Sequence, residues 1–285
     1  METRSTDTAD DPDVATQGNA LRAWLAGHGR VAIGFSGGVD SAFLAVVARQ
    51  TLGASGVLAI IGRSASYPAE QWAAARRVAR QFDVPVLELD TDELNDPEYA
   101  ANPANRCYFC KSELWGRLVP AARARGFHTI VDGTNADDLL DHRPGARAAR
   151  EHQVSSPLSE LGFTKDDIRR ASRALGLPTW QQPSSPCLSS RIPYGTAVTR
   201  ERLTQIEVAE AALRALGIEG DLRVRYHDEL ARVELAPATL AIWLQPARIQ
   251  AVRDAVARAG FERVAIDLRG FRSGSLNVLH GVTPA

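Results

Sequence analysis

The strongest constraint on the fold is a short apolar run that ends in two glycines and leads into an apolar helix pattern. Residues 30–35 read RVAIGF, and residues 39–53 read VDSAFLAVVARQTLG with apolar side chains at helical spacing. This order predicts a buried strand, a tight loop and a helix that ends at Gly53. Backbone N–H groups in such a loop, together with the positive end of the helix dipole, bind phosphate oxygens. The stretch is therefore a predicted anion-binding site.

The alternation of strand and helix continues along the first half of the chain. Strand patterns lie at residues 56–62, 85–90 and 128–134, and helix patterns lie at 69–82 and 112–126. Alternation of this kind favours an α/β fold with a parallel, doubly wound sheet that carries helices on both faces. Ligands of such sheets bind at the carboxyl ends of the strands.

Domain organisation follows from the places where these patterns change. Residues 1–20 are polar and acidic without periodicity, which predicts a disordered tail. Residues 21–180 carry the alternating pattern and form the predicted anion-binding domain, which includes a helix capped at Thr164. A stretch rich in Pro and Ser leads into residues 181–285, whose patterns predict a smaller α+β domain.

Charge and hydropathy exclude several classes of function. The 33 Lys and Arg residues nearly balance the 34 Asp and Glu residues, and the net charge of -1 argues against a nucleic-acid partner or an anionic membrane surface. The first residues lack the apolar core of a signal peptide, and no apolar run approaches the roughly 18 residues of a membrane span. We therefore expect a cytoplasmic protein without a membrane segment.

The predicted anion loop differs from a Walker A loop because the Gly-Lys-Ser/Thr ending is not present. Two serine hydroxyls can donate to an anion, and Asp40 can orient the loop or help to hold a metal ion. The predicted loop residues are Ser36, Gly37, Gly38, Val39, Asp40 and Ser41.

A second polar segment, DGTNADD at residues 132–138, follows a predicted strand and should reach the same edge of the sheet. Acidic side chains beside phosphate oxygens are typical Mg²⁺ ligands. The candidates are Asp132, Thr134, Asn135, Asp137 and Asp138. An ordinary capped turn explains one or two of these aspartates equally well.

The chain has three cysteines, of which Cys107 and Cys110 form a Cys-x-x-Cys pair and Cys187 lies much further on. In a reducing compartment such a pair indicates metal binding or redox chemistry rather than a structural disulfide. The residues alone leave three alternatives open. The first is an iron–sulfur cluster. The second is a redox pair, Cys107 and Cys110, that reloads Cys187 by disulfide exchange. A zinc site is the third, with a fourth ligand from His128, His142 or His152.

Five segments together resemble a known family across nearly the whole chain from Leu21. They read SGGVDS, NRCYFCK, DGTNADD, PCLSSRIPYG and RVRYH, in that order. The first resembles the pyrophosphate loop of the PP-loop ATPases, and the combination resembles the LarE family. The resemblance implies an enzyme that uses ATP and Mg²⁺ to adenylate carboxylates of pyridinium-3,5-biscarboxylic acid mononucleotide. It also implies their conversion to thiocarboxylates for the nickel pincer cofactor of lactate racemase.

The resemblance assigns expected roles to residues at matching positions. Nucleotide contacts are implied for the anion loop and for Ser64, Ala65, Gly133, Thr134 and Asp137. Cys187 is the sulfur-bearing position of the family. Some members give up the sulfur of that cysteine, whereas others hold a 4Fe-4S cluster with three cysteines. Because Cys107, Cys110 and Cys187 match the second pattern, we expect the cluster, with inorganic sulfide or a sulfur donor as partner and loss of the Cys187 sulfur as the nearest rival.

A substrate with a phosphate and two carboxylates needs fixed cations. Arg223 and Arg225 alternate on a predicted strand and so point the same way, and guanidinium groups bind such anions bidentately. Arg191 is a third candidate, and Glu234 is expected to orient an arginine or bind a metal ion. The expected catalytic residues are Cys187, Asp40, Ser190 and Arg191.

Other functions predict different features. A tRNA thiolase needs a basic surface, for which HRPGARAAR at residues 142–150 is a local candidate. An amidating synthetase of the NAD synthetase type leaves the three cysteines unexplained. A nucleotide-binding module with a structural zinc predicts ATP binding without pyrophosphate release. For the leading function we expect a homo-oligomer whose C-terminal domain binds substrate and mediates assembly.

Overall fold

The computed structural model describes residues 12–140, 144–183 and 185–272. By contacts between residues the chain divides into two compact units. Unit 1 comprises Met1–Arg63, Ala69–Thr91 and Cys110–Ser184, and unit 2 comprises Ser64–Pro68, Asp92–Phe109 and Ser185–Ala285. The sequence predicts two contiguous domains that meet near residue 180, whereas here two internal segments group with the C-terminal residues.

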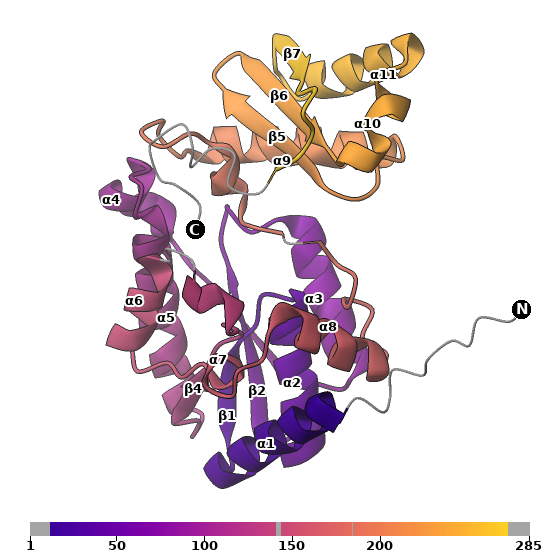
Figure 1. The fold of residues 1–285 in the computed structure, drawn as a ribbon. Helices are drawn as coiled ribbons and strands as arrows, with labels where there is room; N and C mark the ends of the chain where they lie inside the picture. Colours follow the sequence, from indigo (N-terminus) through magenta and orange to yellow (C-terminus); the bar gives the residue numbers. More distant parts are fainter. Residues whose placement is uncertain (1–11, 141–143, 184, 273–285) are drawn as a thin grey trace, which may run out of the picture. The chain divides into compact units, whose positions relative to one another are not determined.

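Unit 1 is built on a four-stranded parallel sheet, as the alternating pattern predicts (Figure 1). The strand order is β3-β2-β1-β4. The strands are β1 (Val31–Gly34), β2 (Val57–Arg63), β3 (Val86–Asp90) and β4 (Thr129–Val131). In register, β1 pairs Val31 with Val57 of β2 on one side and with Thr129 of β4 on the other. The predicted α/β fold class is confirmed.

Helices cover both faces of this sheet. In Figure 1, α2 (Val39–Leu52), α3 (Ala69–Gln81) and α8 (Lys165–Ala174) lie on one side of the strands, and α5 (Arg106–Arg123) and α6 (Pro144–Glu151) lie on the other. The connection after β1 runs over one face of the sheet, and the connection from β3 to β4 runs over the other. In such sheets, ligands bind at the carboxyl ends of the two strands where the connections change face, here β1 and β4. Both predicted polar loops follow these two strands.

Helix α5 begins at Arg106, earlier than the sequence predicts, and so contains both Cys107 and Cys110. The N–H of Arg106 donates to the carbonyl of Pro103 at 2.9 Å, which starts the helical turn just after that proline. The division between the two units falls within this helix, after Phe109.

The predicted disordered tail of residues 1–20 is wrong in its second part, because α1 extends from Pro12 to His28. Its periodicity becomes visible only when Leu21 and Leu25, both fully buried, are included in the pattern. Helix α1 packs against α2 and α8. Its start at Pro12 fits the preference of proline for the first turn of a helix. Residues 1–11 lie outside the described residues.

The N-terminus of α8 has the predicted cap at Thr164. Thr164 Oγ1 accepts from the N–H of Asp167 at 3.2 Å, and Asp167 Oδ2 accepts from the N–H of Thr164 at 2.9 Å. This capping box satisfies donors that a helix terminus otherwise leaves unpaired. The short elements of unit 1 that flank it are η2 (Asp137–Leu140) and α7 (Pro157–Glu160).

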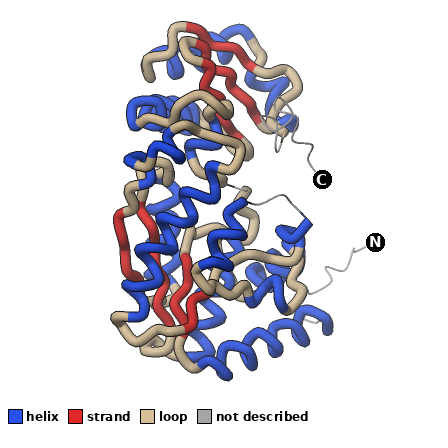
Figure 2. The backbone as a smooth tube through the Cα atoms, turned by 90° about the vertical axis from the view of Figure 1, so that its left-hand side faces the viewer, coloured by secondary structure: helices blue, strands red, loops and turns tan. Residues whose placement is uncertain are grey.

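Unit 2 contains a three-stranded mixed sheet, seen in red with its helices in Figure 2. Strands β5 (Leu222–His227) and β6 (Leu230–Leu235) are antiparallel, and β7 (Arg263–Ile266) runs parallel to β6. Helix α9 (Arg200–Ala215) packs against β5 and against α11 (Pro246–Ala257). The other helical elements are η1 (Glu93–Asn95), α4 (Pro97–Ala100), η3 (Leu188–Arg191) and α10 (Pro237–Trp243).

No helix among the residues that the structure describes is both long enough and apolar enough to cross a membrane.

The capping box predicts a pH-dependent contribution to stability. Burial acts to raise the pKa of Asp167, but hydrogen bonds from Thr164 and the nearby Arg170 outweigh burial and lower it. The folded-state pKa thus lies below the unfolded value, so the stabilisation is present above about pH 4 and is lost as pH falls through the lower folded pKa. We expect Asp167→Asn to reduce the free energy of unfolding by about 1 kcal/mol at pH 7.

Urea unfolding of both proteins at pH 7, 5 and 3 measures this difference, which should shrink toward pH 3. Asp166→Asn is the matched control, because Asp166 lies in the same first turn and is not part of the capping box. Equal, pH-independent effects of the two substitutions would contradict the prediction.

Candidate functional site

The loop between β1 and α2 has the geometry of an anion site. Gly37 has a positive φ of 70°, and a Cβ at this position would lie 2.5 Å from the Cβ of Ala75 in α3. Gly38 is the N-cap of α2 and has no side chain to occupy the first N–H groups of the helix. These N–H groups and the helix dipole attract negative charge. Glycine is therefore required at residue 37 for both backbone conformation and space.

The two predicted serines close this loop. Ser36 Oγ and Ser41 Oγ lie 3.2 Å apart, and Gln71 Nε2 donates to the Ser36 carbonyl at 3.0 Å. Val39 is 4% exposed, so only its backbone N–H is suited to meet an anion. The loop residues predicted from sequence thus form one local structure at the carboxyl end of β1.

The β4 loop packs directly against this anion loop. A Cβ on Gly133 would lie 2.8 Å from the Ser41 nitrogen, so only glycine allows the approach. Asp132 accepts from the N–H of Thr134 at 3.1 Å and from Ser156 Oγ at 2.8 Å. Ser156 is brought there by Ser155, which forms a parallel bridge with Val131.

Several of the predicted Mg²⁺ ligands have structural partners inside this loop. Asn135 and Asp138 bond reciprocally, because each backbone N–H donates to the other side chain, at 3.1 and 3.2 Å. Asp137 Oδ2 accepts from the N–H of Lys165 at 2.8 Å. The capped-turn interpretation therefore accounts for Asp132 and Asp138, and Asp40 and Asp137 are the carboxylates beside the anion loop.

Lys165 is a functional candidate that sequence reasoning missed. Its Nζ lies 2.5 Å from Asp40 Oδ2, and Asn135 Nδ2 lies 3.4 Å from Asp40 Oδ1. Lys165 is the first residue of α8 and supplies the cation that the loop itself lacks. The N-cap at Thr164 is visible in the sequence, but a separation of 125 residues hides the pairing with Asp40.

The predicted adenosine contacts Ser64 and Ala65 belong to unit 2. Ser64 Oγ lies 2.9 Å from Ser66 Oγ, which in turn donates to the buried carboxylate of Glu93 at 3.1 Å. The backbone oxygen of Ser66 accepts from the N–H of Leu188 at 2.8 Å. This segment therefore supports the turn that follows Cys187.

The three cysteines form no disulfide and lie on two different elements. Cys107 and Cys110 lie one turn apart on α5, exposed and half-buried respectively, and the half-buried Cys187 is the N-cap of η3. Cys107 and Cys187 belong to unit 2, and Cys110 belongs to unit 1. Within the described residues, no three His, Cys, Asp or Glu side chains gather into a metal-ligand group.

His142, one of the histidines considered for zinc, lies outside the described residues.

Arg106 holds the turn that follows Cys187. It is 4% exposed and donates through Nη1 to the carbonyl of Ser189 at 3.0 Å. Burial lowers the pKa of Arg106, but attraction to Cys187 and Cys107 outweighs burial and raises it. Sequence reasoning missed this residue because an arginine next to a cysteine carries no pattern of its own.

Arg191 is built into the protein interior. It is 2% exposed, and its Nε and Nη2 each lie 2.9 Å from an oxygen of Glu210. Its Nη1 donates to the carbonyls of Pro186 and Cys187 at 2.5 and 3.0 Å and lies 3.1 Å from Ser190 Oγ. These contacts engage all three guanidinium nitrogens and hold the Cys187 turn. Direct binding of substrate by Arg191 stays a prediction.

Arg223 and Arg225 are also buried, at 4% and 5% exposure. Arg225 pairs with the fully buried Glu234 at 2.8 Å and donates to the Ser190 carbonyl at 3.0 Å. Burial and the positive charge of Arg191 lower the pKa of Arg223 to about 10. Glu234 is thus the ion-pair partner of Arg225, and its predicted role at the substrate or at a metal ion stays a prediction. Arg223 is the arginine crowded by like charges.

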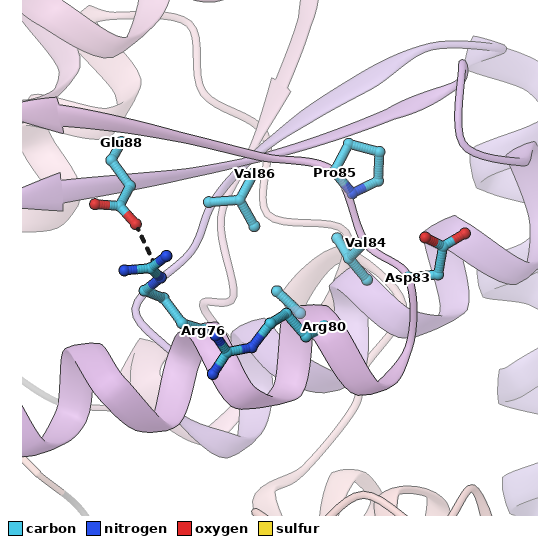
Figure 3. Close-up of a pocket in the computed structure, with 8 residues that line it drawn as sticks. Arg76, Arg80, Asp83, Val84, Pro85, Val86 and Glu88 are labelled. Atoms are coloured by element: carbon cyan, nitrogen blue, oxygen red, sulfur yellow. Dashed lines mark ion pairs between the residues drawn. The ribbon is translucent and has the colours of Figure 1, made fainter.

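A groove elsewhere in unit 1 is distinct from the anion loop. It has a volume of about 400 Å³ and lies between α3 and β3 (Figure 3). Arg76 reaches across it to Glu88 at 3.4 Å, and Val84, Pro85 and Val86 form one wall. These residues belong to the amino-terminal end of the edge strand, so the groove lies away from the edge at which α/β sheets bind ligands.

The position of Lys165 predicts an effect on nucleotide binding. We expect Lys165→Ala to weaken ATP binding about 10-fold, because it removes a cation beside the anion loop and leaves Asp40 without its ion pair. Lys165→Arg should retain most of the affinity. Isothermal titration calorimetry with ATP measures the change.

Arg170→Ala is the control, since it removes an exposed cation from the same helix. Unchanged ATP affinity in Lys165→Ala, or an equal loss in the control, would show that Lys165 does not serve the anion site.

The burial of Arg191 predicts a large effect on stability. Glu210→Ala leaves a buried guanidinium without its carboxylate and should reduce the free energy of unfolding by about 3 kcal/mol. Glu229→Ala, which breaks the exposed pair with Arg263, should reduce it by less than about 1 kcal/mol. Chemical denaturation of both variants measures the difference, and similar values would refute the burial argument.

Comparison with known proteins gives concordant results. A family described as NAD synthase matches residues 21–106, which include β1, the anion loop and α2. An uncharacterized protein of Synechocystis is 43% identical over 257 residues, which cover 90% of this chain and 95% of that protein. A GMP synthase (glutamine-hydrolyzing) of Leifsonia xyli is 30% identical over 71% of this chain but only 45% of its own length.

A relative with a described activity covers both units. The pyridinium-3,5-bisthiocarboxylic acid mononucleotide synthase of Lactiplantibacillus plantarum, a LarE protein, is 35% identical over 268 residues. The match spans 93% of this chain and 95% of that synthase. Together with the anion loop at the carboxyl end of β1, it shows that the chain is a PP-loop ATP-utilising enzyme and belongs to the LarE family.

Proposed function

We propose that this protein is an ATP-dependent sulfur transferase that converts carboxylates of pyridinium-3,5-biscarboxylic acid mononucleotide into thiocarboxylates. The observation that carries the proposal is the turn at Cys187 in unit 2, whose carbonyls accept from the buried Arg106, Arg191 and Arg225. The L. plantarum relative is named for the corresponding bisthiocarboxylic product. The product would serve the nickel pincer cofactor of an enzyme such as lactate racemase.

The first step is activation of a substrate carboxylate by ATP. A carboxylate oxygen attacks the α-phosphorus, the bond to the β-phosphate oxygen breaks, and pyrophosphate leaves. The N–H groups at the start of α2 and the Lys165 ammonium stabilise the charge on the phosphates. The carboxylates of Asp40 and Asp137 suit Mg²⁺, which would neutralise phosphate charge when bound.

The second step replaces AMP with sulfur. A sulfur nucleophile attacks the acyl carbon of the adenylate, the bond from that carbon to the bridging oxygen breaks, and AMP leaves with the electron pair. Ser190 and the carbonyl-bound Arg191 keep the Cys187 turn in one conformation. The sulfur is thereby fixed while the activated carbon approaches.

The buried arginines of unit 2 favour an anionic substrate. The depressed pKa of Arg223 means that neighbouring positive charges and burial disfavour its charged form. A carboxylate or phosphate bound at this arginine would relieve both effects. We therefore propose Arg223 and Arg225 as ligands of the substrate, with Glu234 orienting Arg225.

We further propose that Cys107, Cys110 and Cys187 hold a 4Fe-4S cluster. Cys107 and Cys110, which lie one turn apart on α5, and Cys187 offer the soft sulfur donors that such a cluster prefers. When bound, a cluster with three protein ligands would supply an iron that is open to sulfide. Inorganic sulfide or a sulfur donor would then be the sulfur source, and Cys187 would not be consumed.

Oligomeric state and cell compartment are part of the same proposal. We infer a cytoplasmic homo-oligomer, because the reducing cytoplasm keeps all three thiols available. Size-exclusion chromatography with light scattering measures the number of chains.

Anaerobic reconstitution with iron and sulfide, followed by turnover with ATP and the dicarboxylate nucleotide, tests the function and its sulfur source. We expect pyrophosphate, AMP and thiocarboxylate in equal amounts, about four irons per chain and an unchanged protein mass. Cys110→Ser should lose the iron and the sulfur transfer while pyrophosphate release continues.

Other outcomes separate the rivals. A colourless protein whose Cys187 loses its sulfur during turnover would replace the cluster with sacrificial transfer. ATP binding without pyrophosphate release would refute the enzymatic proposal, and activity on tRNA alone would change the substrate.

A further inference from the structure

The turn that carries Cys187 is held by three guanidinium groups from three separate parts of the chain. Arg191 donates to the carbonyls of Pro186 and Cys187, Arg106 to that of Ser189, and Arg225 to that of Ser190. Four of five consecutive carbonyls are thus fixed by charged donors, which form stronger hydrogen bonds than neutral ones. Arg191 pairs with the partly buried Glu210 and Arg225 with the fully buried Glu234, whereas Arg106 is supported in a different way.

The support of Arg106 is Asn102, a fully buried amide. Arg106 Nη1 donates to Asn102 Oδ1 at 2.5 Å. Asn102 Nδ2 lies 2.8 Å from each of the carbonyls of Pro193 and Thr196. The Asn102 carbonyl accepts from the N–H of Gly195 at 2.9 Å. One side chain therefore joins the start of α5 to the segment that follows the Cys187 turn.

The backbone at Asn102 is adapted to this role. Its φ is 57°, in the left-handed region that asparagine adopts more readily than most residues. This conformation directs the amide into the protein, where each polar atom has a partner. The signal was present in the sequence as an Asn-Pro pair, but the pair predicts only a turn.

Arg106 is an unfavourable residue for stability at this position. It is the first residue of α5, an 18-residue helix, and a cation at a helix N-terminus opposes the helix dipole. It is also buried, which disfavours a charge. Its compensation comes from two carbonyl-type acceptors, Asn102 Oδ1 and the Ser189 carbonyl. A neutral donor would hold the same carbonyl without these penalties.

We infer that Asn102 and Arg106 are positioning residues that hold the Cys187 turn against the start of α5 for sulfur delivery. This inference rests on the proposed function and deepens it. The two residues act only on the second step, because their contacts are all with the segments that carry Cys107 and Cys187. Adenylation takes place at the anion loop of unit 1, which neither residue contacts in the described structure.

The first test separates the two chemical steps. Arg106→Met and Asn102→Asp should each reduce thiocarboxylate formation about 10- to 100-fold, the scale expected when a reacting group is misplaced. Pyrophosphate release should remain within about 2-fold, a change of less than about 0.5 kcal/mol in barrier. Arg106→Lys keeps the charge and one donor, so it should restore part of the sulfur transfer. Thermal unfolding of each variant confirms that the protein is folded.

Arg169→Met is the matched control. Arg169 also donates to two backbone carbonyls, those of Trp180 and Gln182 at 3.1 Å, but it belongs to unit 1 and lies on α8. It should lose stability without any change in the ratio of thiocarboxylate to pyrophosphate. A parallel loss of both products in Arg106→Met, or a lowered ratio in Arg169→Met, would overturn the inference.

A second measurement does not depend on substrate. In a Cys110→Ser background, dibromobimane becomes fluorescent after it bridges Cys107 and Cys187. Bridging should slow about 10-fold in Arg106→Met and Asn102→Asp and should be unchanged in Arg169→Met. Equal bridging in all variants would overturn the inference. Slower bridging in the two variants, if the protein with all three cysteines forms no thiocarboxylate, would instead sustain the positioning role and refute the proposed function.

Discussion

Parallel pairing of β1 with both β2 and β4 is the constraint on which the nucleotide site depends. The pairing brings the carboxyl ends of β1 and β4 to one edge, so the loops that follow them must pack together. Gly133 permits that packing, because any side chain would collide with the Ser41 nitrogen at the start of α2. The sheet thereby positions Asp40, and α8 adds Lys165, without either residue being near the other in sequence. The anion site is a consequence of strand order combined with the absence of a Cβ at one position.

Unit 2 holds Cys187 in a turn that has almost no regular secondary structure apart from the short helix η3. Four carbonyls around Cys187 receive charged hydrogen bonds, and the arginines that supply them are buried. Buried charge is tolerated only with compensation, here the carboxylates of Glu210 and Glu234 and the amide of Asn102. Burial of these charges costs folding free energy, but their hydrogen bonds fix the conformation of the Cys187 turn. This is consistent with a turn whose purpose is chemistry rather than folding.

The two sites divide the proposed reaction between phosphate chemistry and sulfur chemistry. The anion loop stabilises negative charge with backbone N–H groups and one lysine, and these groups need no change of protonation. In the proposed reaction, the Cys187 turn, which Arg106 holds through the Ser189 carbonyl, belongs to the sulfur chemistry. Arg223, crowded by like charges, supplies a reason for an anionic substrate to bind in the unit that contains Cys187. Each unit therefore contributes a chemically distinct part of one proposed mechanism.

The sequence by itself determined the parallel α/β sheet, the anion loop, the cap at Thr164 and the cysteine pattern, because periodicity, glycine geometry and capping are local properties of the chain. It did not predict α1, since the apolar face of that helix is visible only together with Leu21 and Leu25. Tertiary structure alone decided that Lys165 meets Asp40, that Arg191 faces Glu210 rather than solvent, and that Asn102 joins two distant segments. The physical reason is that burial and charge pairing depend on contacts between residues far apart in sequence, which leave no periodic trace in the amino-acid order.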